Sequence, residues 1–256
     1  MTKLTSIVIT KNEEENIERC LHSLKEISDE IIVVDAYSED NTEVICKKCD
    51  VRFYQNEFKG YASQRNYAAS LALNDYVLFI DADEEISTEL RTHLKKTKEE
   101  FRYDAYKLKR LNNYCGKWIK HSGWYPDEKL RLYNKNMAKW IGEDIHEKLV
   151  LKENTKINII SGHLYHYTYP SISAHIRGIE KYSELSARAK FKKGKRMSIF
   201  FILFRLFYSF FYRYFIRLGI LDGYYGFVIC IISAYGNFIK DILLLEMYKK
   251  SRKQYA

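Results

Sequence analysis

Residues 74–85 read Asn-Asp-Tyr-Val-Leu-Phe-Ile-Asp-Ala-Asp-Glu-Glu, an apolar run that breaks off into acids. The run from Tyr76 to Ile80 has the composition of a buried β-strand. Because alternate side chains of a strand point to the same side, we expect Asp81 and Asp83 to face one object beyond the strand end. A divalent cation carrying a diphosphate is such an object, since Mg²⁺ and Mn²⁺ prefer oxygen ligands and often share them with phosphates. A single Asp-x-Asp pair is weak evidence by itself, so the rest of the chain decides its meaning.

Strand and helix patterns alternate through the first hundred residues. Strands are predicted over residues 4–10, 30–35, 51–54 and 76–81, and helices over 12–24, 42–48 and 60–73. This alternation predicts an α/β fold with a mostly parallel sheet and right-handed crossovers. Such sheets bind ligands beyond the carboxyl ends of their strands, where Thr10, Asp35 and Asp81 are all expected.

The pattern changes after a charged helix predicted over residues 88–100. Short strands follow, predicted over residues 104–110, 129–133, 148–151 and 157–160, with aromatic and acidic loops between them. From Pro170 onward the chain is predicted to be helical. We therefore expect a first domain over residues 1–170 and a helical extension over residues 171–256.

The extension has an unusual composition. Residues 198–218 are aromatic and apolar, interrupted by Arg205, Arg213 and Arg217, which fall on one polar arc of a helix. No uncharged run reaches the roughly 18 residues that a bilayer span requires, and residues 224–239 supply 16 in a row. We therefore predict a helix pair lying in the membrane interface, attracted to anionic lipid by the basic cluster at residues 192–196. The alternative is a helical subdomain packed on the first domain.

Charge and cysteine usage set further bounds. The 256-residue chain has a formal net charge of +9, so anionic partners are expected. Cys46 and Cys49 have metal-ligand spacing, but no second pair accompanies them, and core packing is the expected role. Five scattered cysteines and the lack of a secretory leader indicate a reducing compartment. Nucleic acid is an unlikely partner, because the basic residues gather beside an aromatic, apolar helix.

Several motifs occur in a recognisable order. Residues 6–13 read SIVITKNE, 32–38 IVVDAYS, 60–66 GYASQRN and 79–83 FIDAD. They resemble the nucleotide-sugar-binding half of family 2 glycosyltransferases, which have the GT-A fold. The later GWYPD (123–127), LRLY (130–133), HE (146–147), LYHYTY (164–169) and RLGILDG (217–223) resemble the bacterial subgroup that adds glucose or a related sugar to the lipopolysaccharide or lipooligosaccharide inner core.

The resemblance implies a donor site for a UDP-sugar and a divalent cation. The residues implied to bind the donor are Thr10, Asn12, Glu13, Asp35, Arg65, Asn66 and Asp81. Asp81 and Asp83 would hold Mg²⁺ or Mn²⁺, with His166 as a third ligand and His163 as its rival. The cation would neutralise the departing nucleoside diphosphate.

An inverting transferase also needs a general base for the attacking hydroxyl. The resemblance implies Glu147 for this role, with Asp144 and Glu143 as rivals. Trp124, Tyr125 and His146 would contact donor or acceptor sugar.

The implied activity is metal-dependent, inverting transfer of a hexose, with glucose as the first candidate, to a lipid-borne glycan at the cytoplasmic face of a bacterial inner membrane. Capsule or other surface polysaccharide, or a protein, is the alternative acceptor. A nucleotidyltransferase would need a Gly-rich basic phosphate loop, whereas residues 10–15 read TKNEEE. A non-catalytic membrane adaptor is the third account, in which Asp83 would be dispensable.

Overall fold

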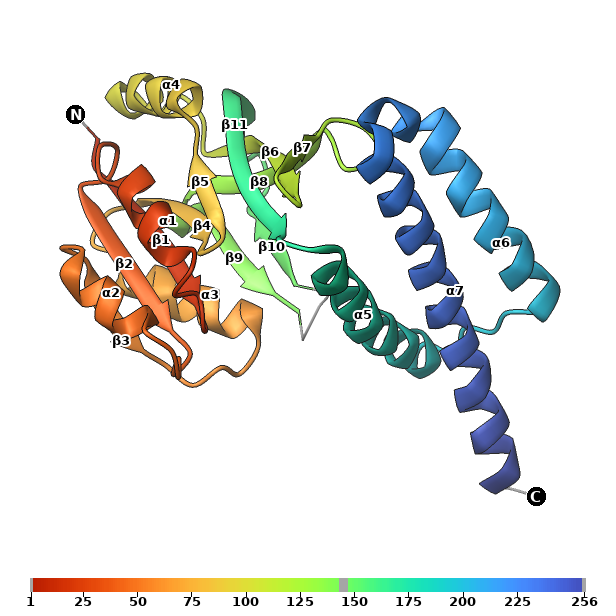
Figure 1. Ribbon diagram of the computed structural model, residues 1–256. Helices are drawn as coiled ribbons and strands as arrows, with labels where there is room; N and C mark the ends of the chain where they lie inside the picture. The colour runs from red at the N-terminus through yellow and green to blue at the C-terminus, as the bar shows by residue number, and fades with distance from the viewer. Residues whose placement is uncertain (1, 143–146, 255–256) are drawn as a thin grey trace. The chain divides into compact units, whose positions relative to one another are not determined.

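The computed structural model describes residues 2–142 and 147–254, which form two compact units (Figure 1). Unit 1 comprises residues 2–111 and 127–167, and unit 2 comprises the remaining described residues, 112–126 and 168–254. The predicted functional boundary at residue 170 stays a prediction. The two compact units divide the chain differently from this prediction, because residues 112–126 and 168–170 belong to the same unit as the C-terminal helices.

The first half of unit 1 is a parallel sheet. Its strands are β1 (Leu4–Thr10), β2 (Glu30–Asp35), β3 (Arg52–Gln55) and β4 (Tyr76–Asp81), in the order β3-β2-β1-β4. Both faces are covered, so these strands read as continuous apolar runs and not as alternating ones. Ile7, Ile32 and Phe79 are buried on one face, and Val8, Val33 and Ile80 on the other.

Helices cover the two faces unequally. Helices α1 (Ile17–Leu24), α2 (Thr42–Lys48) and α4 (Thr88–Glu99) bury their apolar residues in the cluster on the Val8 face. Helix α3 (Tyr61–Leu71) packs Ala68 on the Ile7 face. The carboxyl ends of β1, β2 and β4 are Thr10, Asp35 and Asp81.

The sheet continues with antiparallel strands. They are β8 (Asp127–Asn134), β6 (Ala105–Tyr114), β11 (Ile157–Tyr169) and β5 (Glu84–Ile86), in that order beyond β4, with β7 (Lys117–Ile119) paired to β6. A short 3₁₀ turn (Lys135–Met137) leads into a separate pair, β9 (Ala138–Ile141) and β10 (Lys148–Leu151). The predicted α/β fold is confirmed, with a mixed sheet whose N-terminal half is parallel.

Two local predictions were wrong. Helix α1 begins at Ile17 instead of residue 12, because Asn12 has a φ of 54° and its side chain accepts a hydrogen bond from the Glu39 N–H. The strand predicted over residues 157–160 is too short, because it continues through the histidine segment to Tyr169 as β11, a single 13-residue strand.

Unit 2 contains three helices, α5 (Ile172–Lys192), α6 (Ile199–Phe211) and α7 (Gly223–Gln254). A π-helical turn (Tyr212–Ile216) and a 3₁₀ turn (Gly219–Asp222) connect α6 to α7. Helix α7 packs against both α5 and α6 (Figure 1). Gly236 permits the close approach to α5, because a Cβ there would lie 2.7 Å from Ile179 Cγ2.

The hydropathy of unit 2 corrects one expectation. Two helical segments, Ile199–Ile216 and Gly219–Ser251, are long and apolar enough to cross a membrane when isolated charges are tolerated. The prediction that no segment is long enough to span a bilayer counted uncharged runs alone. Length and composition therefore permit a membrane-spanning arrangement as well as the interfacial one.

Candidate active site

The strand ends converge as predicted. Thr10 is paired with Asp35 across β1 and β2, and Ile9 is paired with Asp81 across β1 and β4. Thr10, Asp35 and Asp81 thus lie at the same edge of the parallel sheet, on three adjacent strands. This edge is where α/β sheets bind their ligands.

Asp35 and Thr10 differ in how their polar atoms are used. Asp35 is fully buried and accepts hydrogen bonds from the Ser38 N–H (2.8 Å) and the Ser38 hydroxyl (2.5 Å). Thr10 is 6% exposed, and its buried Oγ1 has no hydrogen-bond partner. A buried hydroxyl without a partner at a strand end is available to a ligand.

The loop after β1 is tied to the loop after β2. The Asn12 N–H donates to Ser38 Oγ (2.8 Å), and the Glu13 N–H donates to Thr42 Oγ1 (2.8 Å). The Glu13 carboxylate accepts from the Asn16 amide, while burial raises the pKa of Glu13. Asn12 and Glu13 are therefore held next to Asp35.

Asp81 lies in a network of buried charges. Its Oδ2 is 2.5 Å from Arg131 Nη2, which is also 2.6 Å from Glu84 Oε1. The Asp81 N–H donates to Glu84 Oε2, and Arg110 Nη1 lies 3.3 Å from Glu84 Oε1. Burial by itself would raise the pKa of Asp81, but the Arg131 and Arg65 guanidinium groups outweigh it and hold that pKa well below its usual range.

Arg65 joins Asp81 to Glu147. Its Nη2 lies 3.2 Å from Asp81 Oδ1, and its Nη1 lies 2.5 Å from Glu147 Oε1. The guanidinium also stacks on Trp140, 4.4 Å from the ring centroid. Glu147 Oε2 is buried without a hydrogen-bond partner, and burial raises the pKa of this carboxyl despite Arg65. Arg65 thus directly contacts two other predicted site residues, Asp81 and Glu147.

Asp83 and His166 form a second pair. Strand β11 runs antiparallel to β5 with His166 opposite Glu84, and this register places His166 Nε2 3.1 Å from Asp83 Oδ2. The rival, His163, instead lies 4.0 Å from Glu89. The structure therefore brings His166, and not His163, to the acidic strand end.

A divalent cation fits this pair in part. Within residues 2–142 and 147–254 no group of three His, Cys, Asp or Glu side chains is arranged to hold a metal ion. Asp81 forms ion pairs with arginines, so only Asp83 and His166 of the predicted ligands lie together. A carboxylate and an imidazole leave positions for phosphate oxygens and water, and the imidazole favours Mn²⁺ over Mg²⁺.

Three other predicted residues have structural contacts. The side-chain amide of Asn66 makes two hydrogen bonds with the main chain of Trp140. Its Nδ2 donates to the Trp140 carbonyl (2.8 Å), and its Oδ1 accepts from the Trp140 N–H (3.1 Å). These bonds favour a role in supporting β9 over contact with the UDP-sugar. Trp124 packs in the hydrophobic cluster of unit 2, against Tyr114 and His175. Tyr125 is half-buried in the same unit. Glu143, Asp144 and His146 lie outside the described residues.

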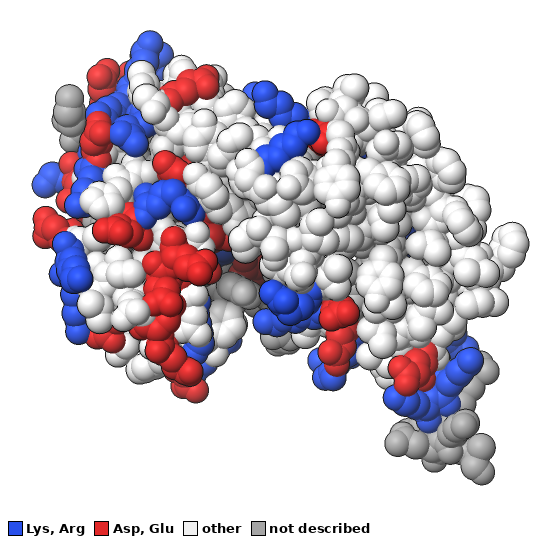
Figure 2. Space-filling model, viewed as in Figure 1, with Lys and Arg blue, Asp and Glu red and all other residues white. Residues whose placement is uncertain are grey.

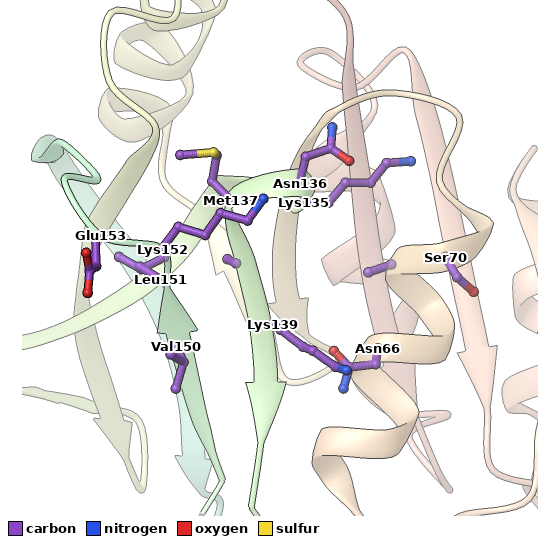
Figure 3. A pocket seen from close by; sticks show the side chains of 12 residues that line it. Asn66, Ser70, Lys135, Asn136, Met137, Lys139, Val150, Leu151, Lys152 and Glu153 are labelled. Carbon is purple, nitrogen blue, oxygen red and sulfur yellow. The ribbon is translucent and has the colours of Figure 1, made fainter.

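A pocket of about 880 Å³ lies beside the predicted site residues but shares only Asn66 with them (Figure 3). It is lined by α3, the 3₁₀ turn and the β9–β10 pair, and Lys139 extends toward Asn66. Its lining includes three lysines, Lys135, Lys139 and Lys152, together with apolar residues such as Leu151. None of the strand-end acids lines this pocket.

Sequence reasoning missed Arg131, Glu84 and Arg110 as parts of the site. Arg131 is 4% exposed and Glu84 is fully buried. The available signal was the position of Arg131 between Leu130 and Leu132, in a strand whose neighbours are apolar. A cation there must find a buried carboxylate, because an unpaired buried charge is too costly.

A parallel α/β half-sheet with acids at its strand ends, followed by antiparallel strands that return a histidine to those acids, defines a GT-A fold. Residues 5–167 match the family model for Glycosyl transferase family 2. The chain belongs to this family and is a glycosyltransferase.

Sequence similarity to a glycosyltransferase of another bacterium agrees with this membership. An uncharacterized glycosyltransferase of Rickettsia typhi is 36% identical over 266 residues, covering 100% of this chain and 91% of the relative. The lipopolysaccharide core biosynthesis glycosyltransferase LpsC of Rhizobium meliloti is 26% identical over 210 residues, covering 78% and 76%. The Staphylococcus aureus TarS 1–349 structure in complex with UDP-GlcNAc has a TM-score of 0.48 and 22% identity, covering 66% of this chain and 58% of that one.

Proposed function

We propose that this glycosyltransferase moves a hexose, with glucose as the first candidate, from a UDP-sugar to a lipid-borne glycan by an inverting, metal-dependent reaction. The observation that carries the proposal is the contact between Asp83 and His166 directly after β4, whose last residue Asp81 lies beside Thr10 and Asp35 on the adjacent strands. Charge of both signs is concentrated there. That combination suits a ligand that carries both a diphosphate and a cation.

The donor nucleotide would bind along the strand ends. Asp35 would accept from the uracil N3–H or the ribose, and the unpartnered Thr10 hydroxyl would bind the same nucleotide. Asn12 and Glu13 would border the nucleotide, since their loop is tied to Ser38. Arg65 would bind the diphosphate, because a guanidinium binds phosphate oxygens bidentately.

Asp83 and His166 would hold the divalent cation. The bound cation would supply Lewis-acid neutralisation of the diphosphate leaving group. Asp81, fixed by Arg131, would orient the loop that carries Asp83 and remain ionised near the donor. The buried Glu84 backs this arrangement by accepting from the Asp81 N–H.

The attacking hydroxyl would lose its proton to a carboxylate while its oxygen bonds to the anomeric carbon of the sugar and displaces the nucleoside diphosphate in line. Glu147 is the proposed base, since it is half-buried beside Arg65 and has a raised pKa. Asp144 and Glu143 remain the rivals. Trp124, Tyr125 and His146 are retained as proposed sugar contacts, although Trp124 also contributes to the core of unit 2.

The acceptor would be lipid-linked, such as the lipopolysaccharide inner core, and the protein peripheral on the cytoplasmic face of the bacterial inner membrane. The similarity to a lipopolysaccharide core glycosyltransferase supports the acceptor class, and the exposed apolar side chains of α6 support membrane attachment. Alkaline carbonate extraction tests the arrangement. A peripheral protein is released, and a spanning one stays in the membrane fraction.

Isothermal titration with a panel of UDP-sugars, with and without Mn²⁺, tests the central proposal. We expect one UDP-hexose to bind in the presence of Mn²⁺ and to bind much more weakly after chelation. A hydrolysis assay on the same panel would then identify the sugar that the enzyme transfers to water. If no UDP-sugar binds in the presence of metal, the proposed activity is wrong.

A further inference from the structure

Helix α6 has the reverse of the polarity that a helix in water shows. Its aromatic side chains are exposed, including Phe200 (80%), Phe204 (57%) and Phe207 (63%), whereas Ser209 is buried. Figure 2 shows a broad surface over α6 and the adjoining part of α7 with almost no charged side chains. A soluble helix buries its apolar stripe and exposes its polar one. The exposed face of α6 therefore suits contact with hydrocarbon.

The polar side chains of α6 are used inside unit 2. Arg205 Nη1 lies 2.5 Å from Asp241 Oδ2 on α7, and Asp241 also binds Lys190 at 2.8 Å. The Asn237 amide donates to Ser209 Oγ at 3.0 Å. The Arg205 side of the predicted arc therefore faces α7, where Asp241 neutralises its charge.

The turn between α6 and α7 forms an apolar tip. We define the tip by its exposed side chains, which are Phe215, Ile216, Leu218, Ile220, Leu221 and Tyr224. Their exposed fractions run from 47% for Leu218 to 70% for Ile216. Six adjacent apolar side chains at a helix turn form a contiguous patch of the kind that marks an interaction surface.

Four cationic residues belong either to this turn or to segment 117–123, which is hydrogen-bonded to it, and we call them the cationic collar: Lys117, Lys120, Arg213 and Arg217. Lys117 Nζ donates to the Asp222 carbonyl (2.7 Å), and Arg213 Nη1 donates to the Ser122 carbonyl (3.3 Å). A Cβ on Gly123 would lie 3.3 Å from Arg213 and 3.8 Å from Arg217. The collar therefore combines residues about a hundred positions apart in the sequence.

The collar has one counter-charge, which is buried. Asp222 is the only acid within residues 112–126 and 198–236, and it is 3% exposed. Its carboxylate accepts from the Lys120 and His121 N–H groups and from the Ser122 hydroxyl (3.2, 3.0 and 2.9 Å). These bonds hold segment 117–123 on the turn. Four cations and one buried carboxylate leave the exposed rim with an excess of positive charge.

We propose that the cationic collar is a binding site for the phosphate groups of anionic membrane lipids, with the apolar tip entering the acyl region beneath them. An apolar tip with cations beside it matches the two layers of an anionic bilayer surface, which are the acyl chains and the phosphate groups above them. The proposal rests on the proposed membrane attachment and is independent of the sugar that is transferred. It also differs from the sequence expectation, which placed the lipid contact at residues 192–196.

Vesicle flotation of the full-length protein tests the collar. Vesicles of phosphatidylcholine alone are compared with vesicles that also contain phosphatidylglycerol. We expect tighter binding to the second kind, with the difference falling at high salt. The double variant Lys120→Gln/Arg217→Gln removes two exposed charges and should lower binding to phosphatidylglycerol vesicles about 30-fold, with binding to phosphatidylcholine unchanged.

Matched variants separate the site from general charge. Lys139→Gln/Lys152→Gln removes two cations from the pocket of unit 1 and should leave flotation unchanged. Lys120→Arg/Arg217→Lys keeps both charges and should bind like the wild type. Equal losses in the two Gln pairs would overturn the proposal.

Two other outcomes would also overturn it. Equal flotation of the wild type with both kinds of vesicle would remove the phosphate site but leave membrane attachment standing. If the wild-type protein floats with neither kind of vesicle and is dimeric by light scattering, the apolar tip would instead bind a second copy of this chain. UDP-sugar binding measured on the same samples reports separately on the proposed activity.

Discussion

Arg65 Nη1 lies 2.5 Å from Glu147 Oε1, in an ion pair whose two side chains are only 9% and 18% exposed. The same guanidinium contacts Asp81 through Nη2. Arg65, which is proposed to bind the diphosphate, is therefore ion-paired with Glu147, the proposed general base, before any donor binds. A diphosphate would compete with both carboxylates for this guanidinium, and Glu147 would then be released to accept a proton.

Glu147→Gln tests the base. Because a general base contributes about 10²- to 10⁴-fold, kcat should fall by at least about 100-fold, and UDP-sugar affinity should be retained. The measurement is steady-state transfer together with titration of the donor. Glu153→Gln, the same exchange close to the end of β10, is the matched control and should leave kcat unchanged. If Asp144→Asn shows the loss and Glu147→Gln does not, the base is Asp144.

Asp83→Asn and His166→Gln test the cation site. Each removes one of the two ligands that lie 3.1 Å apart, so the stimulation of donor binding by Mn²⁺ should be lost. Titration of UDP-sugar with Mn²⁺ and with a chelator measures that stimulation directly. His163→Gln alters the other histidine of β11, which lies near Glu89, and should keep the stimulation. Loss of stimulation only in His163→Gln would transfer the metal role to His163.

Arg131→Met tests the buried charge network. It leaves Asp81 and Glu84 without their shared cation, so the free energy of unfolding should fall by about 3–5 kcal/mol. Urea unfolding measures the change. Arg91→Met breaks an ion pair with the exposed Glu26 and should cost at most about 1 kcal/mol. Similar values for the two variants would show that Arg131 is not held in a buried network.

His175 makes unit 2 sensitive to acid. It is 1% exposed beside the Tyr114 hydroxyl, and burial lowers its pKa from 6.5 to about 4. The unfolded chain therefore binds a proton in the window between these two values while the folded chain does not. Stability is complete above about pH 6.5 and is lost as the pH falls toward 4.

The difference should be about 3 kcal/mol between about pH 7.5 and pH 4, measured by urea unfolding. His175→Gln should lack this part of the pH dependence. His22→Gln, at an exposed histidine, should retain it. An identical pH profile for wild type and His175→Gln would contradict the assignment.

The strand ends were predictable because they depend on local patterns. Apolar runs that stop at Thr10, Asp35 and Asp81 predict strands, and the alternation with helices predicts parallel pairing. The structure has this parallel pairing, with Thr10 opposite Asp35 and Ile9 opposite Asp81. The choice between His163 and His166 was not predictable, because it depends on how β11 pairs with β5 far along the chain.

The role of the arginines was predictable in part. The arc of Arg205, Arg213 and Arg217 follows from helical periodicity, but periodicity does not say which face meets the protein. Contact with Asp241 shows that the Arg205 side of the arc faces α7 and that the phenylalanines are exposed. Arg131 was visible in the sequence only as a cation among leucines, without its partners.

The sequence alone determined the α/β fold, the acidic strand end and the apolar, basic character of the C-terminal helices, since these depend on spacing between near neighbours. Only the tertiary structure decided that Asp81 pairs with Arg131 while Asp83 pairs with His166, and that the segment carrying Lys117 and Lys120 lies against the turn that carries Arg213 and Arg217. Those contacts join residues about 50 to 100 positions apart. They are set by strand register and helix packing, which bring distant charges together in ways that no local pattern records.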